Sequence, residues 1–321
     1  MSRPTASIAS MPLGDLPLSR GSLDRAAHRR AEPDLVPKLL ADPATRVVVI
    51  VAESMEVLPD GALAVRPPAP DDRHRLAFFL GEEVTTEAAD PDSGTERTTY
   101  LAVVGDPTES GHDDWQTLRN AGADLSDRDA GIFTTAQALA NWHAAHQFCP
   151  RCGAPTEPEQ AGWIRRCTRD KSEHYPRTDP AVIMAVVDDD DRLLLGRNAQ
   201  WPEGRFSVLA GFVEPGESFE AAVAREVEEE VGIQITDVTY LGNQPWPFPS
   251  SDMVGFRARA TTTSLHPDTV EMAEARWFTR DEYRNALTTK EIRTPSGISI
   301  AQRLIEHWLG QRIAEIADVS W

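Results

Sequence analysis

The sequence predicts an α/β (α+β) protein with more than one domain. Short apolar runs rich in β-branched residues recur along the chain, as at Arg46–Val51 and Ala181–Val187, and such runs are typical of strands. Other stretches place apolar residues three and four positions apart, which is the helical period. The length of 321 residues, 40% of them hydrophobic, exceeds one ordinary domain and is enough to bury a sizeable core.

We expect four segments along the chain. Residues 1–30 are rich in Pro, Ser, Arg and Ala without a sustained period, which predicts a loosely ordered arm. Residues 31–145 predict an N-terminal mixed α/β domain, and residues 146–178 a small cysteine module. Residues 179–321 predict a second mixed α/β domain.

The elements of the N-terminal domain are three strands and a helix. The second and third strands are expected to form an antiparallel hairpin, because a polar, acidic stretch containing Asp90–Gly94 joins them. The expected strands are Arg46–Val51, Arg75–Leu80 and Thr99–Val104, and the expected helix is Ala130–His146.

The elements of the last domain follow from the same patterns. Its strands are expected at Ala181–Val187, Arg192–Gly196, Val208–Phe212, Val238–Leu241 and Met253–Ala260. Its helices are expected at Phe219–Val231, Arg280–Asn285 and Ser299–Ala317.

Composition and charge exclude several classes of protein. No apolar run approaches the roughly 20 residues of a membrane helix, so we expect no membrane association. The net charge of −19 disfavours non-specific binding to a nucleic-acid backbone, although metal ions would let a small anionic substrate bind. Three cysteines are too few for a disulfide scaffold, and no secretory signal is evident, which favours a cytoplasmic location.

The stretch from Leu209 to Ile233 carries the chemistry of the last domain. Its apolar residues fall on one stripe of the predicted helix, and Glu226, Glu229 and Glu230 lie along the flank of that stripe. Neighbouring carboxylates at these steps repel each other unless a cation lies between them, and oxygen ligands select Mg²⁺ or Mn²⁺. The alternative is a solvated acidic face.

These residues resemble the Nudix box at every defined position. The matching residues are Gly211, Glu217, Arg225, Glu226, Glu229, Glu230, Val231, Gly232 and Ile233. The resemblance implies a Nudix α/β/α sandwich and a hydrolase that cleaves the pyrophosphate of a nucleoside diphosphate linked to another group.

The resemblance also implies roles for individual residues. Glu226, Glu229 and Glu230 would be catalytic and bind Mg²⁺ or Mn²⁺, together with the carbonyl of Ala210. Glu217 and Arg225 would pair in a structural role. A divalent ion lowers the pKa of a coordinated water, and a glutamate can accept its proton; we expect Glu229 to be that base.

The segment Asn243–Ser251 predicts a site for flat rings. Three alternating prolines stiffen it and remove backbone donors, and Trp246 and Phe248 alternate with them. Aromatic faces on a rigid support can stack on bases. The alternative is a surface loop with its aromatic residues in the core.

Beside the box, this loop resembles the array of the NADH pyrophosphatase (NudC-type) branch of the Nudix family, except that Asn243 stands where the pattern has Ser. The resemblance implies a further metal ligand at Glu271; Glu274 is the alternative position, and a surface charge is the alternative for either residue. It implies substrate binding by Arg119, Tyr175, Gln244, Pro245, Trp246, Pro247, Phe248, Pro249, Ser250, Ser251 and Ala301.

The cysteine module has the spacing of most of a zinc ribbon. Cys149 and Cys152 are followed by Cys167, and paired cysteine knuckles bind structural Zn²⁺. The branch has a fourth cysteine where this chain has Asp170; His174 is the alternative fourth ligand, and a metal-free ribbon is the alternative for the whole module.

The function that the resemblance implies is hydrolysis of NADH, and less readily NAD⁺, to NMN(H) and AMP. Branch members are homodimers, so we expect a homodimer, and the same chemistry would remove an NAD cap from the 5′ end of RNA. Two alternatives stay open: hydrolysis of another nucleoside diphosphate derivative such as ADP-ribose or a dinucleoside polyphosphate, and a non-catalytic nucleotide-binding zinc-ribbon protein.

Overall fold

Strand pairing in the computed structural model gives four sheets among the residues that it describes, which are 13–14, 16–85, 96–111 and 113–316. The chain divides into two units. The C-terminal unit consists of Met1–Ser19, Asp179–Gln244 and Ser251–Trp321, and the N-terminal unit of Arg20–Thr178 and Pro245–Ser250. No helix in the described part of the chain is long and apolar enough to cross a bilayer.

The C-terminal unit is built on a six-stranded mixed sheet with the order β12-β13-β9-β10-β14, in which β11 also pairs with β9. The central strand β9 runs parallel to β13 and antiparallel to β10 and β11. The strands are β9 (Asp179–Val187), β10 (Leu193–Asn198), β11 (Leu209–Phe212), β12 (Ile235–Trp246), β13 (Ser251–Ala260) and β14 (Met272–Phe278).

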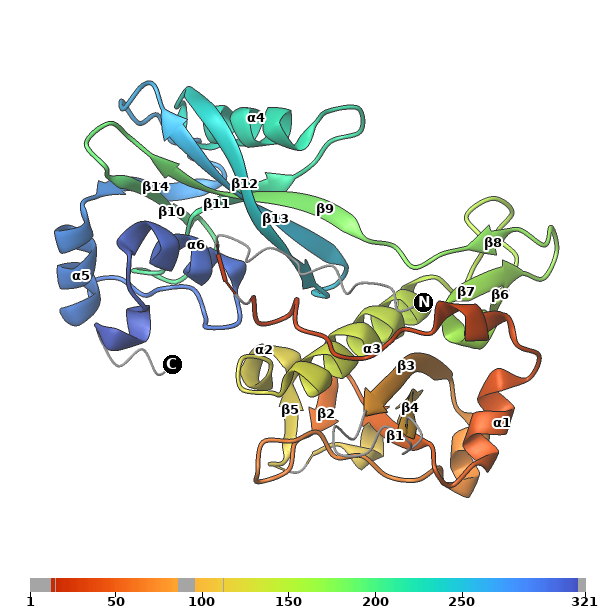
Figure 1. The fold of residues 1–321 in the computed structure, drawn as a ribbon. Coiled ribbons are helices and arrows are strands. Elements are labelled where there is room, and N and C mark those ends of the chain that lie inside the picture. The colour runs from red at the N-terminus through yellow and green to blue at the C-terminus, as the bar shows by residue number, and fades with distance from the viewer. Residues whose placement is uncertain (1–12, 15, 86–95, 112, 317–321) are drawn as a thin grey trace, which may run out of the picture. The chain divides into compact units, whose positions relative to one another are not determined.

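Both faces of this sheet are covered by helices, α4 on one side and α5 and α6 on the other (Figure 1). Successive side chains of a strand point to opposite faces. Accordingly, Val182 and Met184 of β9 pack in the core under α4, whereas Ile183 and Ala185 pack in the core under α6. The arrangement is the expected α/β/α sandwich. Its helices are α4 (Phe219–Val231), α5 (Arg280–Thr288), α6 (Ile300–Leu309) and the 3₁₀ turn η5 (Ile313–Glu315).

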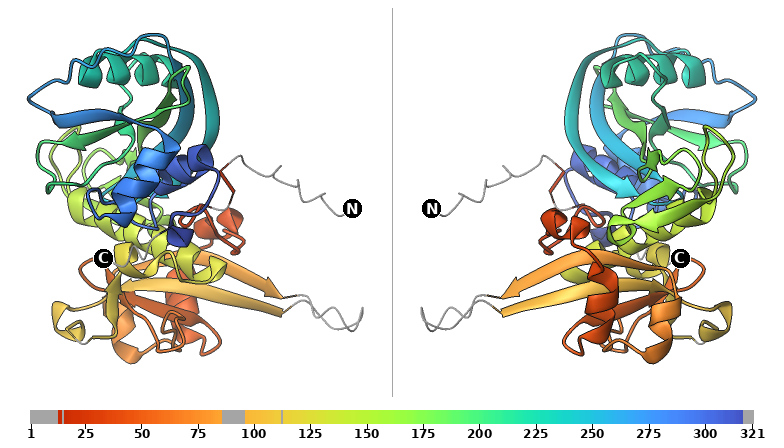
Figure 2. Two further views of the ribbon diagram at one scale, coloured as in Figure 1. Left: turned by 90° about the vertical axis from the view of Figure 1, so that its left-hand side faces the viewer. Right: turned by 90° about the vertical axis from the view of Figure 1, so that its right-hand side faces the viewer.

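The N-terminal unit contains the three-stranded sheet β1-β4-β3, on which the long helix α3 packs. Strands β3 and β4 pair antiparallel as predicted and lie side by side in Figure 2; Asp90–Gly94 lies outside the described residues. The strands are β1 (Arg46–Ile50), β2 (Ser54–Glu56), β3 (Ala77–Thr85), β4 (Glu96–Val104) and β5 (Trp115–Thr117). The helices are η1 (Ala27–Ala31), α1 (Leu35–Ala41), η2 (Pro70–His74), η3 (Pro107–Glu109), α2 (Leu118–Ala121) and α3 (Asp127–Ala145).

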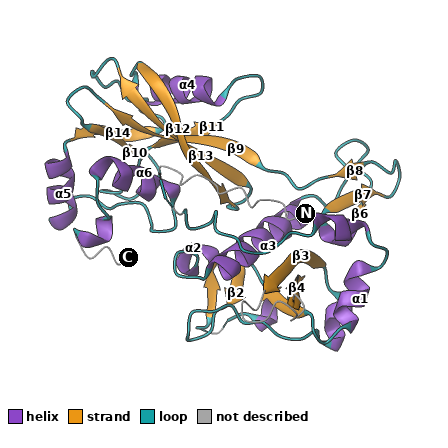
Figure 3. Cartoon of the chain, viewed as in Figure 1, coloured by secondary structure: helices purple, strands orange, loops and turns teal. Residues whose placement is uncertain are grey.

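The cysteine module belongs to the same unit. It forms a small antiparallel sheet with the order β6-β7-β8, visible as three short strands in Figure 3. Its elements are β6 (Thr156–Glu159), η4 (Gln160–Gly162), β7 (Ile164–Cys167) and β8 (Glu173–His174).

Two expectations from the sequence need correction. Residues 1–30 are not a loose arm throughout, because Leu13 and Leu16 are buried in the core under α6 and Leu18 is buried as well. The last helix ends at Leu309 rather than at Ala317, because Gly310 adopts the left-handed conformation (φ 78°) that closes a helix.

Candidate active site

Helix α4 carries the glutamates of the candidate site, and local signals set both of its ends. The Oγ of Ser218 accepts a hydrogen bond from the Ala221 amide at 3.2 Å, which caps the first turn. Gly232 ends the helix in the left-handed conformation with φ 70°. Val223 and Val227 are fully buried against the sheet. The glutamates therefore follow the flank of a helix that is fixed along its whole length.

Arg225 braces the loop before α4 and holds two of the glutamates. Its guanidinium donates to both carboxylate oxygens of Glu217, at 2.6 and 3.1 Å, and to the Phe212 carbonyl at 3.0 Å. It also donates to Glu226 at 2.8 Å and to Glu229 at 2.9 Å. The hydrogen bonds from Arg225 lower the pKa of Glu217. The Glu217–Arg225 pair that the sequence predicts is present.

Glu230 is half-buried, with its Oε2 atom enclosed by the protein. Its Oε2 has no hydrogen-bond partner in the described part of the chain. Burial, followed by repulsion from Glu226 and Glu271, raises the pKa of Glu230 to about 8. Burial also raises the pKa of Glu226, although Arg225 opposes that shift. A divalent cation would remove both the burial penalty and the repulsion, so the donor set fits one.

Strand β11 faces these carboxylates through Gly211. A Cβ atom at that position would lie 1.9 Å from the Cδ of Glu226, so only glycine leaves room for the carboxylate. Ala210 pairs with Ile183 of β9, which fixes the backbone of β11. Among the described residues, the glutamate carboxylates lie farther from one another than the four potential metal ligands of the cysteine module, which are described below.

The aromatic loop, defined here as Pro245–Ser250, comprises the last two residues of β12 and the turn that follows, and it groups with the N-terminal unit. Trp246 and Phe248 meet edge to face with ring centroids 4.8 Å apart. The guanidinium carbon of Arg119 lies 3.8 Å from the Phe248 centroid and 5.1 Å from that of Trp246, both within range of a cation–π contact. The structure thus brings Arg119 onto the loop, although 126 positions or more separate them in the sequence.

Gln244 has a different environment from the one expected of a substrate ligand. Its side chain is 0% exposed. Its Oε1 accepts a hydrogen bond from the Leu18 amide at 3.3 Å, and its Nε2 donates to the Ile298 carbonyl at 3.0 Å. Both ends of the amide are used inside the C-terminal unit. The Gln244 side chain thus links Leu18 to Ile298.

The other expected substrate residues lie at several places. Tyr175 is exposed, and its hydroxyl donates to Glu173 at 2.7 Å. Ser251 begins β13 opposite Asp179 of β9. Ala301 is buried in the first turn of α6, where its amide donates to the Ser299 Oγ at 3.2 Å.

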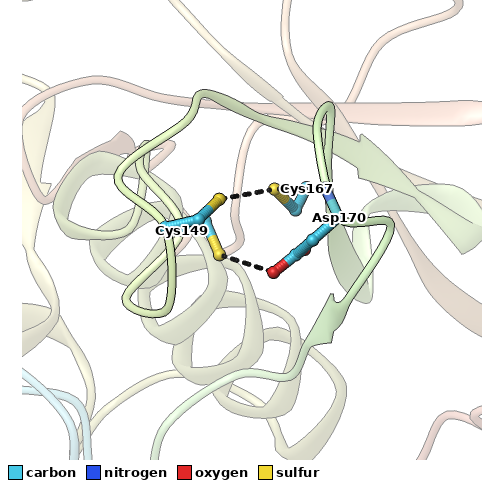
Figure 4. A group of neighbouring side chains, drawn as sticks. Cys149, Cys167 and Asp170 are labelled. Atoms are coloured by element: carbon cyan, nitrogen blue, oxygen red, sulfur yellow. Dashed lines mark hydrogen bonds between the residues drawn. The ribbon is translucent and has the colours of Figure 1, made fainter.

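The cysteine module gathers four potential metal ligands. One atom each from Cys149, Cys152, Cys167 and Asp170 lies within 4.8 Å of the others, and this group does not include His174. Figure 4 shows Cys149, Cys167 and Asp170 directed toward one another. The Cys152 and Cys167 sulfurs are 3.4 Å apart, and the Cys149 sulfur lies 3.9 Å from Asp170 Oδ2. These spacings approximate the ligand–ligand edges of a tetrahedral zinc site, which are about 3–4 Å.

Hydrogen bonds within this group favour the ionised forms of Cys149 and Asp170, which are the forms that bind a metal ion. Burial raises the pKa of Cys149, but hydrogen bonds from Ser172 and from the Arg151 and Cys152 amides outweigh it and lower the pKa to about 6. Hydrogen bonds from the Ser172 side chain and amide lower the pKa of Asp170. Thiolate and carboxylate are the forms that bind Zn²⁺.

The sequence did not indicate the contacts that hold the aromatic loop. Gln137 and Asn141 of α3 donate to carbonyls of the loop, more than a hundred positions away. No local pattern signals such pairs, because polar residues on a helix are more often solvated.

Two family models match the chain. The NUDIX domain matches residues 177–296, and the NADH pyrophosphatase zinc ribbon domain matches residues 144–175. They cover the six-stranded sheet with α4 and α5, and the small sheet with its cysteines, whereas α6 lies beyond the first match.

Several known proteins are similar to part of this chain. The NAD-capped RNA hydrolase NudC of Mycobacterium bovis is 48% identical over 200 residues, which are 60% of this chain and 64% of that protein. An NAD-capped RNA hydrolase of Homo sapiens is 42% identical over 197 residues, which are 58% of this chain and 43% of that protein. The chain thus spans less than two thirds of the length of these relatives. A crystal structure of a NUDIX hydrolase from Nitrosomonas europaea is 22% identical with a TM-score of 0.39, covering 52% of this chain and 94% of that one.

Proposed function

We propose that this chain, which matches the models of the NUDIX domain and of the NADH pyrophosphatase zinc ribbon domain, hydrolyses the pyrophosphate bond of NADH and NAD⁺. The products would be NMN(H) and AMP. Because two of its relatives are named NAD-capped RNA hydrolases, we extend the proposal to the NAD cap at the 5′ end of RNA.

The observation that carries the proposal is the environment of Glu230. A half-buried carboxylate with an enclosed oxygen that has no partner among the described residues, and with a raised pKa, is costly in a fold that needs only stability. Perturbed ionisable groups of this kind gather at functional sites. The alternative, a solvated acidic face, fits Glu228 and Glu229, which are exposed, but not Glu230, which is half-buried.

Four glutamates and a backbone carbonyl would hold Mg²⁺ or Mn²⁺: Glu226, Glu229, Glu230, Glu271 and the carbonyl of Ala210. A divalent ion held there would offset the charge of the diphosphate and lower the pKa of water. Arg225 keeps Glu226 and Glu229 oriented. Glu229 is 61% exposed, which leaves it able to accept a proton from water, and we propose it as the general base.

The aromatic loop would bind the flat rings of the substrate. Trp246 and Phe248 provide aromatic surface, and base stacking on such surface contributes about 1–3 kcal/mol per base. Arg119 adds positive charge beside both rings, which suits an anionic dinucleotide. Tyr175, Ser250, Ser251 and the backbone at Ala301 complete the proposed substrate contacts.

Two further features belong to the proposal. The group of Cys149, Cys152, Cys167 and Asp170 would hold a structural Zn²⁺ that takes no part in the reaction. The chain would act as a homodimer, which sedimentation at working concentration would test.

Product analysis tests the proposed reaction. The purified chain is incubated with NADH, NAD⁺, ADP-ribose or a diadenosine polyphosphate, with Mg²⁺ or with EDTA. We expect NMNH and AMP from NADH, formed only with the divalent ion. Faster turnover of ADP-ribose or of the diadenosine polyphosphate would replace the substrate proposal, and no turnover of any compound would leave a binding protein.

A further inference from the structure

Helix α3 supplies two side-chain amides to the aromatic loop. The Nε2 of Gln137 and the Nδ2 of Asn141 each donate to the Pro247 carbonyl at 3.0 Å, and Asn141 also donates to the Pro249 carbonyl at 3.3 Å. The two residues are one helical turn apart, so their side chains lie on the same face of α3. We call this pair the amide clamp.

The loop depends on outside donors because of its composition. Pro245, Pro247 and Pro249 have no backbone N–H and cannot donate to a ladder. A backbone bond from the Phe248 amide to the Trp246 carbonyl, at 2.7 Å, lies within the loop. The carbonyls on both sides of Phe248 are therefore bound by the clamp, and the backbone that carries the Phe248 ring is held at two points.

From these contacts we infer that Gln137 and Asn141 are positioning residues for substrate binding, an inference that rests on the proposed function of the loop. They hold the backbone in the arrangement in which Trp246, Phe248 and Arg119 meet. A preformed ring site avoids the entropy cost of ordering the loop when the substrate binds. Loss of the clamp then weakens binding without changing the chemical step.

The orientation of the Gln137 amide follows from its surroundings. Its side chain is fully buried, and its Oε1 has no partner among the described residues. Rotating the amide would place that oxygen against the Pro247 carbonyl, which would be repulsive. The fold thus uses only the donor half of Gln137, and an unsatisfied buried acceptor is tolerated in exchange.

The part of α3 that follows the clamp is fixed to the small sheet β6-β7-β8, which we call the ribbon sheet. His143 lies on the next part of α3, where its Nδ1 accepts from Arg165 of β7 and its Nε2 donates to the Gly162 carbonyl, both at 2.8 Å. Arg165 also donates to the Oγ1 and the carbonyl of Thr156, each at 2.7 Å. Helix α3 therefore holds the loop from a position that the ribbon sheet determines.

Two substitutions test the clamp. Asn141→Asp keeps the side-chain volume but removes the donors and turns a charge toward two carbonyls. Gln137→Met removes one donor together with the unsatisfied acceptor, so its thermal stability should not fall. For each variant we expect KM for NADH to rise roughly fivefold or more, the factor for about one hydrogen bond, with kcat within about twofold.

Gln147→Glu is the matched control, because it makes the same change of charge at an exposed amide that donates to the Ala144 carbonyl. It should leave KM unchanged. Unchanged KM in both clamp variants, or a fall of kcat with KM constant, would overturn the inference while the wild-type protein still hydrolyses NADH. A wild-type protein without activity would instead refute the proposed function.

Discussion

At the scale of single residues, Glu230 illustrates how the candidate site departs from a stable core. Burial raises the pKa of Glu230 to about 8, so its surroundings favour the protonated, neutral carboxyl over the charged carboxylate. Gly211 also serves the site, since the Glu226 carboxylate occupies the space that a Cβ atom there would need. Both positions fit cation binding rather than packing.

Glu230→Gln should abolish hydrolysis while the protein stays folded. The amide has the same shape but cannot offer a charged ligand, and we expect kcat/KM for NADH with Mg²⁺ to fall by at least about 100-fold. Glu228→Gln, an exposed neighbour on the same helix, should retain activity within about twofold. A Glu230→Gln protein with more than about a tenth of wild-type activity would contradict the assigned role.

At the scale of elements, the ribbon sheet and α3 are joined by a buried polar contact rather than by apolar packing alone. His143 stacks on Phe78 with centroids 4.9 Å apart and accepts from Arg165. Burial is the main cause that lowers the pKa of His143 to about 4, and the Arg165 charge lowers it further. The imidazole is therefore neutral in the folded protein at pH 7.

This shift predicts a loss of stability at acid pH. Between pH 6.5 and about 4 the unfolded chain binds a proton at His143 that the folded chain does not, so the free energy of unfolding falls as pH decreases through that window. His143→Gln removes the group, and its denaturant-unfolding free energy should fall less steeply from pH 7 to 4. Parallel pH profiles for the two proteins would contradict the buried neutral imidazole.

The fourth ligand of the cysteine group belongs to the same scale. If Asp170 binds Zn²⁺ with the three thiolates, Asp170→Ala should lower zinc affinity by about tenfold or more, and Asp170→Cys should raise it. Competition with a chromogenic chelator measures both. His174→Ala should have no effect, because His174 lies outside the group; the reverse pattern would assign the site to His174.

At the scale of the whole molecule, net charge limits how the proposed NAD-capped RNA would be held. A chain with net charge −19 gains little from contacts with many phosphates, so recognition should concentrate on the cap. The predicted consequence is a weak dependence on salt. Between about 50 and 200 mM salt, kcat/KM for an NAD-capped RNA should fall only about threefold, as for one phosphate contact.

NADH in the same salt series is the reference, and RNAs of two lengths should behave alike. A fall of about a hundredfold for the longer RNA alone would show that several phosphates of the RNA body are bound.

Local signals determined much of this protein. The bounds predicted for Phe219–Val231 coincide with those of α4, because the Ser218 cap and Gly232 act within one turn of the helix. The box spacing and the cysteine spacing likewise identify the two matched domains. Short strands such as β2 and the ribbon strands were missed, since their pairing partners rather than their own residues make them strands.

Only the tertiary structure decided the contacts between residues that are far apart in the chain. The burial of Leu13 and Leu16, the enclosure of Gln244 by Leu18 and Ile298, and the amide clamp each join distant segments. Helical period and turn chemistry act over a few residues, so the sequence by itself determined the elements and the chemistry on α4. Which polar side chain becomes buried, and against what, depends on how the elements pack, and only the folded chain determines that.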